Sequence, residues 1–184
     1  MKIKGRSTTV SKSFIRSWLH AAATVLSFHG NHVDMDTLLV EIKDLSDRVN
    51  KVTGKGVGGT ANWSKNKIEL MEEPISPDHM ATIILHEMIH IACKDFGGDA
   101  RQENSLEKCT STLTARLKPT VQALAQVLHN RQQQNAAYIA HTKRGMAYRN
   151  RRKKDYYDKA QWTKTGAEDK RFHPGHEPQP TYDH

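Results

Sequence analysis

The sequence is poor in cysteine and has no long apolar run. Its two cysteines, Cys93 and Cys109, are too few for a disulfide framework. No stretch approaches 18 uncharged apolar residues, and the basic N-terminal residues are not followed by the apolar segment of a signal peptide. We therefore expect a cytoplasmic protein without a membrane-spanning segment. Each cysteine falls in an apolar helical pattern, which predicts two buried free thiols.

The C-terminal part of the chain lacks leucine and valine altogether. Between residues 131 and 184, Ile139 is the only branched aliphatic residue. The same segment holds 12 Lys or Arg against 6 Asp or Glu, so it carries +6 of the net charge of +8. Such a composition cannot bury enough apolar surface to offset the entropy of ordering. We expect a folded domain at 1–130 and a basic tail at 131–184, disordered or partly helical.

The first 130 residues show alternating strand and helix patterns. Apolar residues at helical spacing and flanking stop signals predict helices at 13–30, 76–96, 99–118 and 121–128. Three short segments predict strands, at 38–43, 60–63 and 67–71. Pro119 is expected to end or kink the third helix. The predicted fold class is α+β, with a small, mostly antiparallel sheet packed on helices.

The second helix carries polar groups in an apolar setting. From Met80 to Cys93, the residues that are not apolar are Thr82, His86, Glu87 and His90. A helix that is apolar nearly all round is normally enclosed by protein. An unpaired carboxylate in such a place costs several kcal/mol or becomes neutral. These three ionisable side chains therefore need a partner.

The spacing of these residues is that of a zinc site. On a helix, His86 and His90 lie on one face, about one turn apart, where both imidazoles can reach one Zn²⁺. Glu87 follows His86 and can take a proton from a zinc-activated water that attacks a carbonyl. This is the H-E-x-x-H arrangement of zinc peptidases. The alternative is a pair of core histidines with hydrogen-bond partners and no metal.

A catalytic zinc usually has three protein ligands. The long metzincin motif is absent, because it needs Gly at Cys93 and His at Phe96. Two glutamates stand on the next helix, and we expect Glu103 to be the third ligand, because it lies closer than Glu107 to the apolar stripe from Leu106 to Leu117. Glu107 is expected to orient a histidine or to serve as the alternative ligand. Both could instead be acidic residues that favour the helix dipole.

Three segments carry a resemblance to a known family. They are G-T-A-N-W-S-K-N-K-I-E-L, L-H-E-M-I-H and E-N-S-L-E. Over residues 38–118 the chain resembles zincin-fold proteins of the ImmA/IrrE type, and most of all the short metallopeptidases encoded by phages. SprT-like proteases are similar up to the active-site helix, but use a later histidine that this chain lacks. The resemblance implies a gluzincin-type zinc peptidase, in the host cytoplasm if phage-encoded. It also implies that substrate adds to an edge strand, for which 67–71 is the candidate.

The sequence thus predicts a zinc-dependent endopeptidase that acts on a protein substrate. The alternative is a non-catalytic, metal-stabilised binding protein whose tail docks nucleic acid or a protein. In the basic region 143–171, the run R-N-R-R-K-K at 149–154 lies among Tyr148, Tyr156, Tyr157 and Trp162. Interleaved charge and aromatic groups suit non-specific binding of single-stranded nucleic acid. A solubilising or docking tail is the other interpretation.

Overall fold

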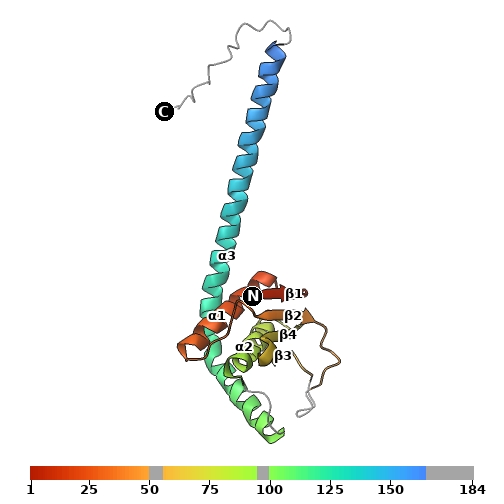
Figure 1. The fold of residues 1–184 in the computed structure, drawn as a ribbon, viewed down its shortest axis with the longest axis vertical. Coiled ribbons are helices and arrows are strands. Elements are labelled where there is room, and N and C mark those ends of the chain that lie inside the picture. The colour runs from red at the N-terminus through yellow and green to blue at the C-terminus, as the bar shows by residue number, and fades with distance from the viewer. Residues whose placement is uncertain (50–55, 95–99, 165–184) are drawn as a thin grey trace. The chain divides into compact units, whose positions relative to one another are not determined.

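Figure 1 shows the fold as a ribbon. The computed structural model describes residues 1–49, 56–94 and 100–164, apart from the side chains of 100–104 and 155–164. The chain divides into two compact units, Met1–Gln133 and Gln134–His184. The first unit contains a four-stranded sheet, two helices and the first part of a third helix. The division falls close to the change in composition at residue 131.

The sheet of the first unit is mixed. Its strand order is β1 (Lys2–Lys4), β2 (Leu39–Lys43), β4 (Lys67–Met71) and β3 (Gly59–Asn62). β1 pairs with β2 and β2 with β4 in parallel, and only β3 and β4 are antiparallel. The prediction of a mostly antiparallel sheet is therefore wrong. A helical crossover joins β1 to β2, and such a crossover connects parallel strands; β1 escaped prediction because Lys-Ile-Lys is too short to show a pattern.

The edge of the sheet also differs from the expectation. Residues 67–71 form β4, which lies between β2 and β3 and is paired on both sides. The two edge strands are β1 and β3, and β3 packs against the second helix. The assignment of 67–71 as the edge strand is wrong, because strand order depends on pairing between distant segments. The candidate edge moves to Gly59–Asn62.

The two faces of the sheet differ in polarity. On one face Val40, Ile42, Ile68 and Leu70 are buried and join the hydrophobic core with the helices. The alternate residues form ion pairs across the strands, including Lys67–Glu41 at 2.8 Å and Lys43–Glu69 at 2.6 Å. The period of two along each strand sorts apolar residues to the core and charged residues to the other face.

Helices α1 (Lys12–Phe28) and α2 (Pro77–Cys93) contact each other and confirm two of the expected helices. α2 begins as predicted, because the Ser76 hydroxyl accepts a hydrogen bond from the backbone N–H of His79 at 3.1 Å and Pro77 occupies the first turn. Lys94, in the left-handed conformation, follows the last turn. The predicted glycine stop at 97–98 lies outside the described residues.

Helix α3 (Ala100–Lys164) continues through Pro119, so of the two expected outcomes, a helix end or a kink, the helix end is wrong. Separate helices at 99–118 and 121–128 were therefore the wrong division. Leu117 and Val121 are both buried, so tertiary packing holds the helix on either side of the proline. In Figure 1 the helix changes direction in its green-to-teal part, as helices with an internal proline often do.

Both cysteines are exposed and neither forms a disulfide. The prediction of buried thiols is wrong, and for Cys109 the reason is that its neighbour Thr110 faces the core instead. Within the described chain, no helix is both long enough and apolar enough to cross a membrane.

Candidate metal centre

The histidines of α2 stand on a helix that is buried on nearly every side. His90 is 2% exposed and Glu87 6%, while His86 is the more accessible of the three. The apolar residues around them pack into the core. This confirms the expectation of an enclosed helix with polar groups inside it, which need partners.

The first part of α3 runs antiparallel to α2 and supplies a partner for its histidines. Lys118 forms an ion pair with Asp78 in the first turn of α2, at 2.7 Å. Eleven residues earlier on α3, Glu107 meets His86 and His90. The distance from Lys118 to Glu107 along α3 is about 16 Å, and from Asp78 to the midpoint of the two histidines about 15 Å along α2, at 1.5 Å per residue. The two contacts therefore fix one register between the helices.

Two buried threonines explain why Glu107 points at α2. Thr110 and Thr114 are 2% and 3% exposed, and the Thr114 hydroxyl donates to the Thr110 carbonyl at 2.7 Å. With Leu117 and Val121 they form the core-facing side of α3, and Glu107 lies about 50° from its centre at 100° per residue. The stripe assumed from sequence ran through Leu106 and Cys109 instead. It was misplaced because small hydroxyl side chains can be buried once they bond to their own helix.

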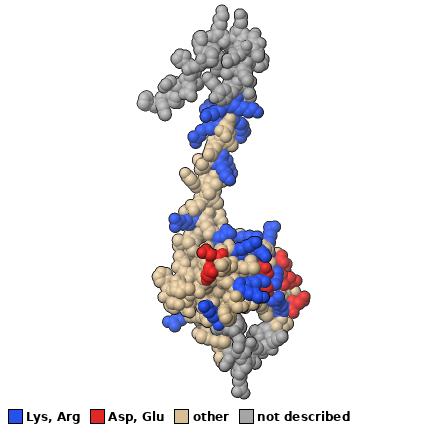
Figure 2. All heavy atoms as spheres, in the orientation of Figure 1, with Lys and Arg blue, Asp and Glu red and all other residues tan. Residues whose placement is uncertain are grey.

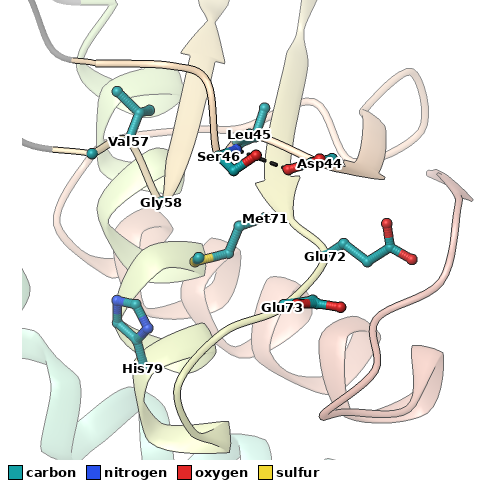
Figure 3. A pocket seen from close by; sticks show the side chains of 10 residues that line it. Asp44, Leu45, Ser46, Val57, Gly58, Met71, Glu72, Glu73 and His79 are labelled. Carbon is teal, nitrogen blue, oxygen red and sulfur yellow. Dashed lines mark hydrogen bonds between the residues drawn. The ribbon is translucent and has the colours of Figure 1, made fainter.

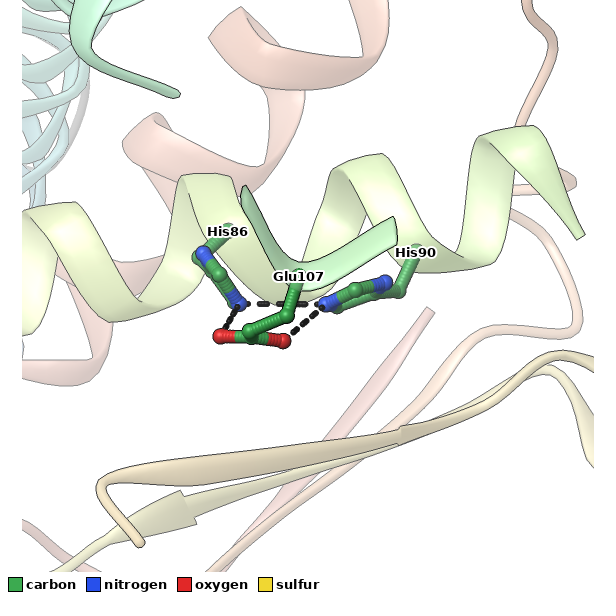
Figure 4. A group of neighbouring side chains, drawn as sticks. All are labelled: His86, His90 and Glu107. Carbon is green, nitrogen blue, oxygen red and sulfur yellow. Dashed lines mark hydrogen bonds and ion pairs between the residues drawn. The ribbon is translucent and has the colours of Figure 1, made fainter. Parts of the chain in front are cut away.

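Three side chains that could bind a metal ion converge at this point, as Figure 4 shows. Glu107 Oε1 is 3.1 Å from His86 Nε2, and Glu107 Oε2 is 3.5 Å from His90 Nε2. The two Nε2 atoms are 3.0 Å apart. Ligands held by tetrahedral zinc at about 2.0–2.2 Å lie roughly 3.3–3.6 Å from one another. The separation of the two imidazole nitrogens, and the distance from each to its nearer carboxylate oxygen, are close to this range.

The electrostatics of the group favour a cation. Hydrogen bonds from His86 and His90 hold the pKa of the Glu107 carboxyl well below its usual range. Each Nε2 faces both the other Nε2, at 3.0 Å, and the Glu107 carboxylate. The Nε2 of a neutral imidazole is either a donor or an acceptor, so two neutral rings cannot satisfy all three contacts at once. A metal ion removes this conflict, because it accepts all three lone pairs. A protonated histidine in hydrogen bond with Glu107 is the metal-free alternative.

Glu87 lies beside this group, under the edge strand. A Cβ placed on Gly59 of β3 would come within 2.9 Å of both Glu87 Cγ and Oε1, and within 2.7 Å of Ile83 Cγ2. Glycine is therefore what lets β3 approach α2 at the position of the carboxylate. Burial raises the pKa of Glu87 to about 8, an effect that His86 opposes and Glu107 reinforces. The carboxyl group of Glu87 is thus shielded from solvent, between the strand and the histidines.

The structure brings together four of the five residues predicted for the site. His86, Glu87 and His90 lie on α2, and Glu107 contacts both histidines from α3. Glu103 belongs to α3, but its side chain lies outside the described residues. Gly59 was missed as a site residue. Its signal in the sequence is the glycine pair Gly58–Gly59 at the start of β3.

A cavity of about 500 Å³ opens at the start of β3. Its walls are the loop residues 44–46 and 56–58, the end of β4 with the segment that follows it, and His79 of α2. Figure 3 shows His79 and Met71 facing the chain at Val57 and Gly58. The cavity is separate from the three candidate ligands, but it adjoins the strand that covers Glu87.

Comparisons with protein-family models, with curated proteins and with solved structures found no match to this chain.

Proposed function

We propose that this protein is a zinc-dependent peptidase of the zincin type, acting on a protein substrate. His86, His90 and Glu107 would hold the metal, and Glu87 would be the general base. The observation that carries the proposal is the convergence of two imidazole nitrogens and one carboxylate, from two antiparallel helices, next to a buried glutamate. A structural zinc site usually has four protein ligands, whereas a catalytic site has three and an open position.

Glu107 is the better candidate for the third ligand on the described geometry. Its two oxygens lie against the Nε2 atoms that also face each other. A carboxylate that only orients a ligating histidine bonds to the ring nitrogen that does not bind the metal. We therefore assign Glu107 to the metal, in place of the sequence-based preference for Glu103.

Zinc bound at these residues would supply a Lewis acid that lowers the pKa of its water and polarises a carbonyl. The chain contributes the rest. The charge of a zinc ion beside it would favour the ionised form of Glu87 despite its burial, and the carboxylate would then accept the proton of the attacking water and pass it to the leaving amine. Its enclosure by β3 and α2 shields it from bulk water, and its nearness to His86 would bring it close to a metal held by that histidine.

The edge strand offers a place for the substrate backbone. β3 pairs with β4 on one side only, so the other side of its backbone is open to a further strand within the described sheet. A peptide added there would lie in extended form over Glu87, because Gly59 brings β3 directly against this side chain. Side chains of that peptide could then reach the cavity at the start of the strand.

The test combines metal content with cleavage. Full-length protein should bind one zinc per chain, and His86→Ala or His90→Ala should abolish this. Glu87→Gln should keep the zinc, because it removes no ligand, and should lose hydrolysis. Since the substrate is unidentified, the probe is a proteome-derived peptide library in which new N-termini are identified by mass spectrometry.

The outcomes separate the proposal from its alternative. New N-termini that require both zinc and Glu87 support the peptidase. Zinc binding with no cleavage, or with cleavage that persists in Glu87→Gln, favours a non-catalytic, metal-stabilised binding protein. If the protein binds no zinc after dialysis against zinc, it is neither a zinc peptidase nor a metal-stabilised binding protein. The two histidines are then a hydrogen-bonded pair.

A further inference from the structure

The helix of the second unit is positively charged on all sides. Residues 134–154 include seven Lys or Arg and no Asp or Glu. The seven are Lys143, Arg144, Arg149, Arg151, Arg152, Lys153 and Lys154, and all are exposed. Figure 2 shows Lys and Arg along this helix without any acidic residue on the visible face. None of the seven forms an ion pair within the described part of the chain, so their charge is available to an outside partner.

The charge is unfavourable for the helix alone. Arg149 lies three residues from Arg152 and four from Lys153, and like charges at these spacings destabilise a helix. Arg152 also lies over the ring of Tyr148, 5.6 Å from its centroid, an i, i+4 pair that holds the guanidinium against the helix. A polyanion would relieve the repulsion and stabilise this helix.

The distribution around the axis selects the shape of the partner. At 100° per residue, Lys143, Arg144, Arg151 and Lys154 span about 100° of the helix, while Arg149, Arg152 and Lys153 occupy the opposite side. A helix that lies on a flat anionic membrane carries its cations on one face and a broad apolar face on the other. Cations on both sides instead match a groove with phosphates along each wall.

The dimensions agree with DNA. The major groove of B-form DNA is about 12 Å wide and admits an α-helix. Residues 143–154 extend over about 18 Å, along which a duplex presents roughly ten phosphates, at one charge per 1.7 Å. The major groove of duplex RNA is too narrow and deep for side chains to enter.

We propose that helix residues 134–154 bind in the major groove of double-stranded DNA through phosphate contacts, without sequence specificity. Because these residues form a helix, we propose duplex DNA in place of the single-stranded nucleic acid suggested by the sequence. This inference is independent of the proposed peptidase, because it uses no residue of the metal centre.

The test uses full-length protein and a fluorescein-labelled DNA duplex of about 20 base pairs, titrated at several salt concentrations. Arg144, Arg151 and Lys154 are changed together to Gln. The matched control changes Lys12, Arg16 and Arg116, which are exposed on the first unit, to Gln as well. Each triple variant therefore has a net charge of +5 in place of +8. The tail variant should bind at least tenfold more weakly near 100 mM salt, and its log–log salt slope should be shallower by about 3. The control should bind like the wild type.

Further probes distinguish the partners. The far-ultraviolet circular dichroism of the protein should gain helix signal when duplex DNA is added. Single-stranded DNA, duplex RNA and vesicles of phosphatidylcholine and phosphatidylserine should each bind more weakly than duplex DNA. Equal effects of the two triple variants, or tighter binding to any of these three probes, would overturn the proposal.

Discussion

Glu107 is the residue on which the proposed metal centre depends most directly. Glu107→Gln keeps the size of the side chain but makes its oxygen a much weaker ligand, so zinc affinity should fall by more than about 100-fold, beyond the 10- to 100-fold typical of an orienting partner. Glu103→Gln is the matched control, with the same charge change one turn away, and should cost less than about tenfold. Competition with a chromophoric chelator measures both. The reverse order would assign the third ligand to Glu103.

Gly59 tests the approach of β3 to Glu87. An added methyl group would lie 2.7 Å from Ile83 Cγ2 and 2.9 Å from two atoms of Glu87, so the strand or the carboxylate must shift. Gly59→Ala should keep zinc, because it touches no proposed ligand, yet lower hydrolysis at least tenfold. Overpacking should also destabilise the fold by about 1–3 kcal/mol. Gly56→Ala is the control, since a Cβ there meets nothing within 4 Å; equal activity of the two variants would remove Gly59 from the site.

At the scale of elements, local signals predicted more than long-range ones. Ser76 and Pro77 marked the start of α2, and the apolar spacing from Ile15 to Leu26 marked the buried face of α1. Both are properties of neighbouring residues, which the sequence displays. The pairing of β2 with β4 and the edge position of β3 depend on segments far apart in the chain. For the same reason, His86 and His90 were identifiable as a pair, while the assignment of Glu107 required the packing of Thr110 and Thr114.

The outer face of the sheet should make the fold sensitive to acid. Burial raises the pKa of Glu69, but hydrogen bonds and ion pairs with Lys43 and Lys67 outweigh it and lower that pKa to about 2. Because the pKa is lower in the folded chain, the stabilisation is present above pH 4.5 and is lost as the pH falls toward 2. Glu69→Gln should therefore reduce the free energy of unfolding by about 1–2 kcal/mol at pH 7, after allowance for solvent screening.

The measurement is urea denaturation of wild type and Glu69→Gln between pH 7 and pH 3. The difference between them should shrink below pH 4.5, because the Glu69 carboxyl then takes up a proton in the unfolded wild type but stays ionised in the folded one until the pH nears 2. Glu73→Gln controls for the loss of an exposed charge, and its effect should stay near zero throughout. A difference for Glu69→Gln that does not change with pH would show that its ion pairs contribute nothing to acid sensitivity.

At the scale of the whole molecule, folding and the charged helix should be separable. Among the described residues, every buried apolar side chain lies between Ile15 and Ala125. In the part of the chain that the structure describes, the last polar contacts to the core helices come from Gln132, whose Oε1 accepts hydrogen bonds from Ser13 at 2.8 Å and Ser17 at 3.4 Å. The residues needed to fold the first unit therefore end near residue 133, although α3 itself continues.

A chain that ends at Gln133 should stay folded and bind zinc as the full-length protein does, with a Tm within about 3 °C, because it keeps the core and both serine contacts. It should lose duplex-DNA binding. A chain that ends at Val127 also loses Leu128 and Gln132, and should melt several degrees lower, since about 1–2 kcal/mol of packing and hydrogen bonding goes with them. Calorimetry and zinc titration of the three chains check this. Unfolding of the 133-residue chain would mean that the second unit stabilises the first, and the charged helix would then have a structural role as well.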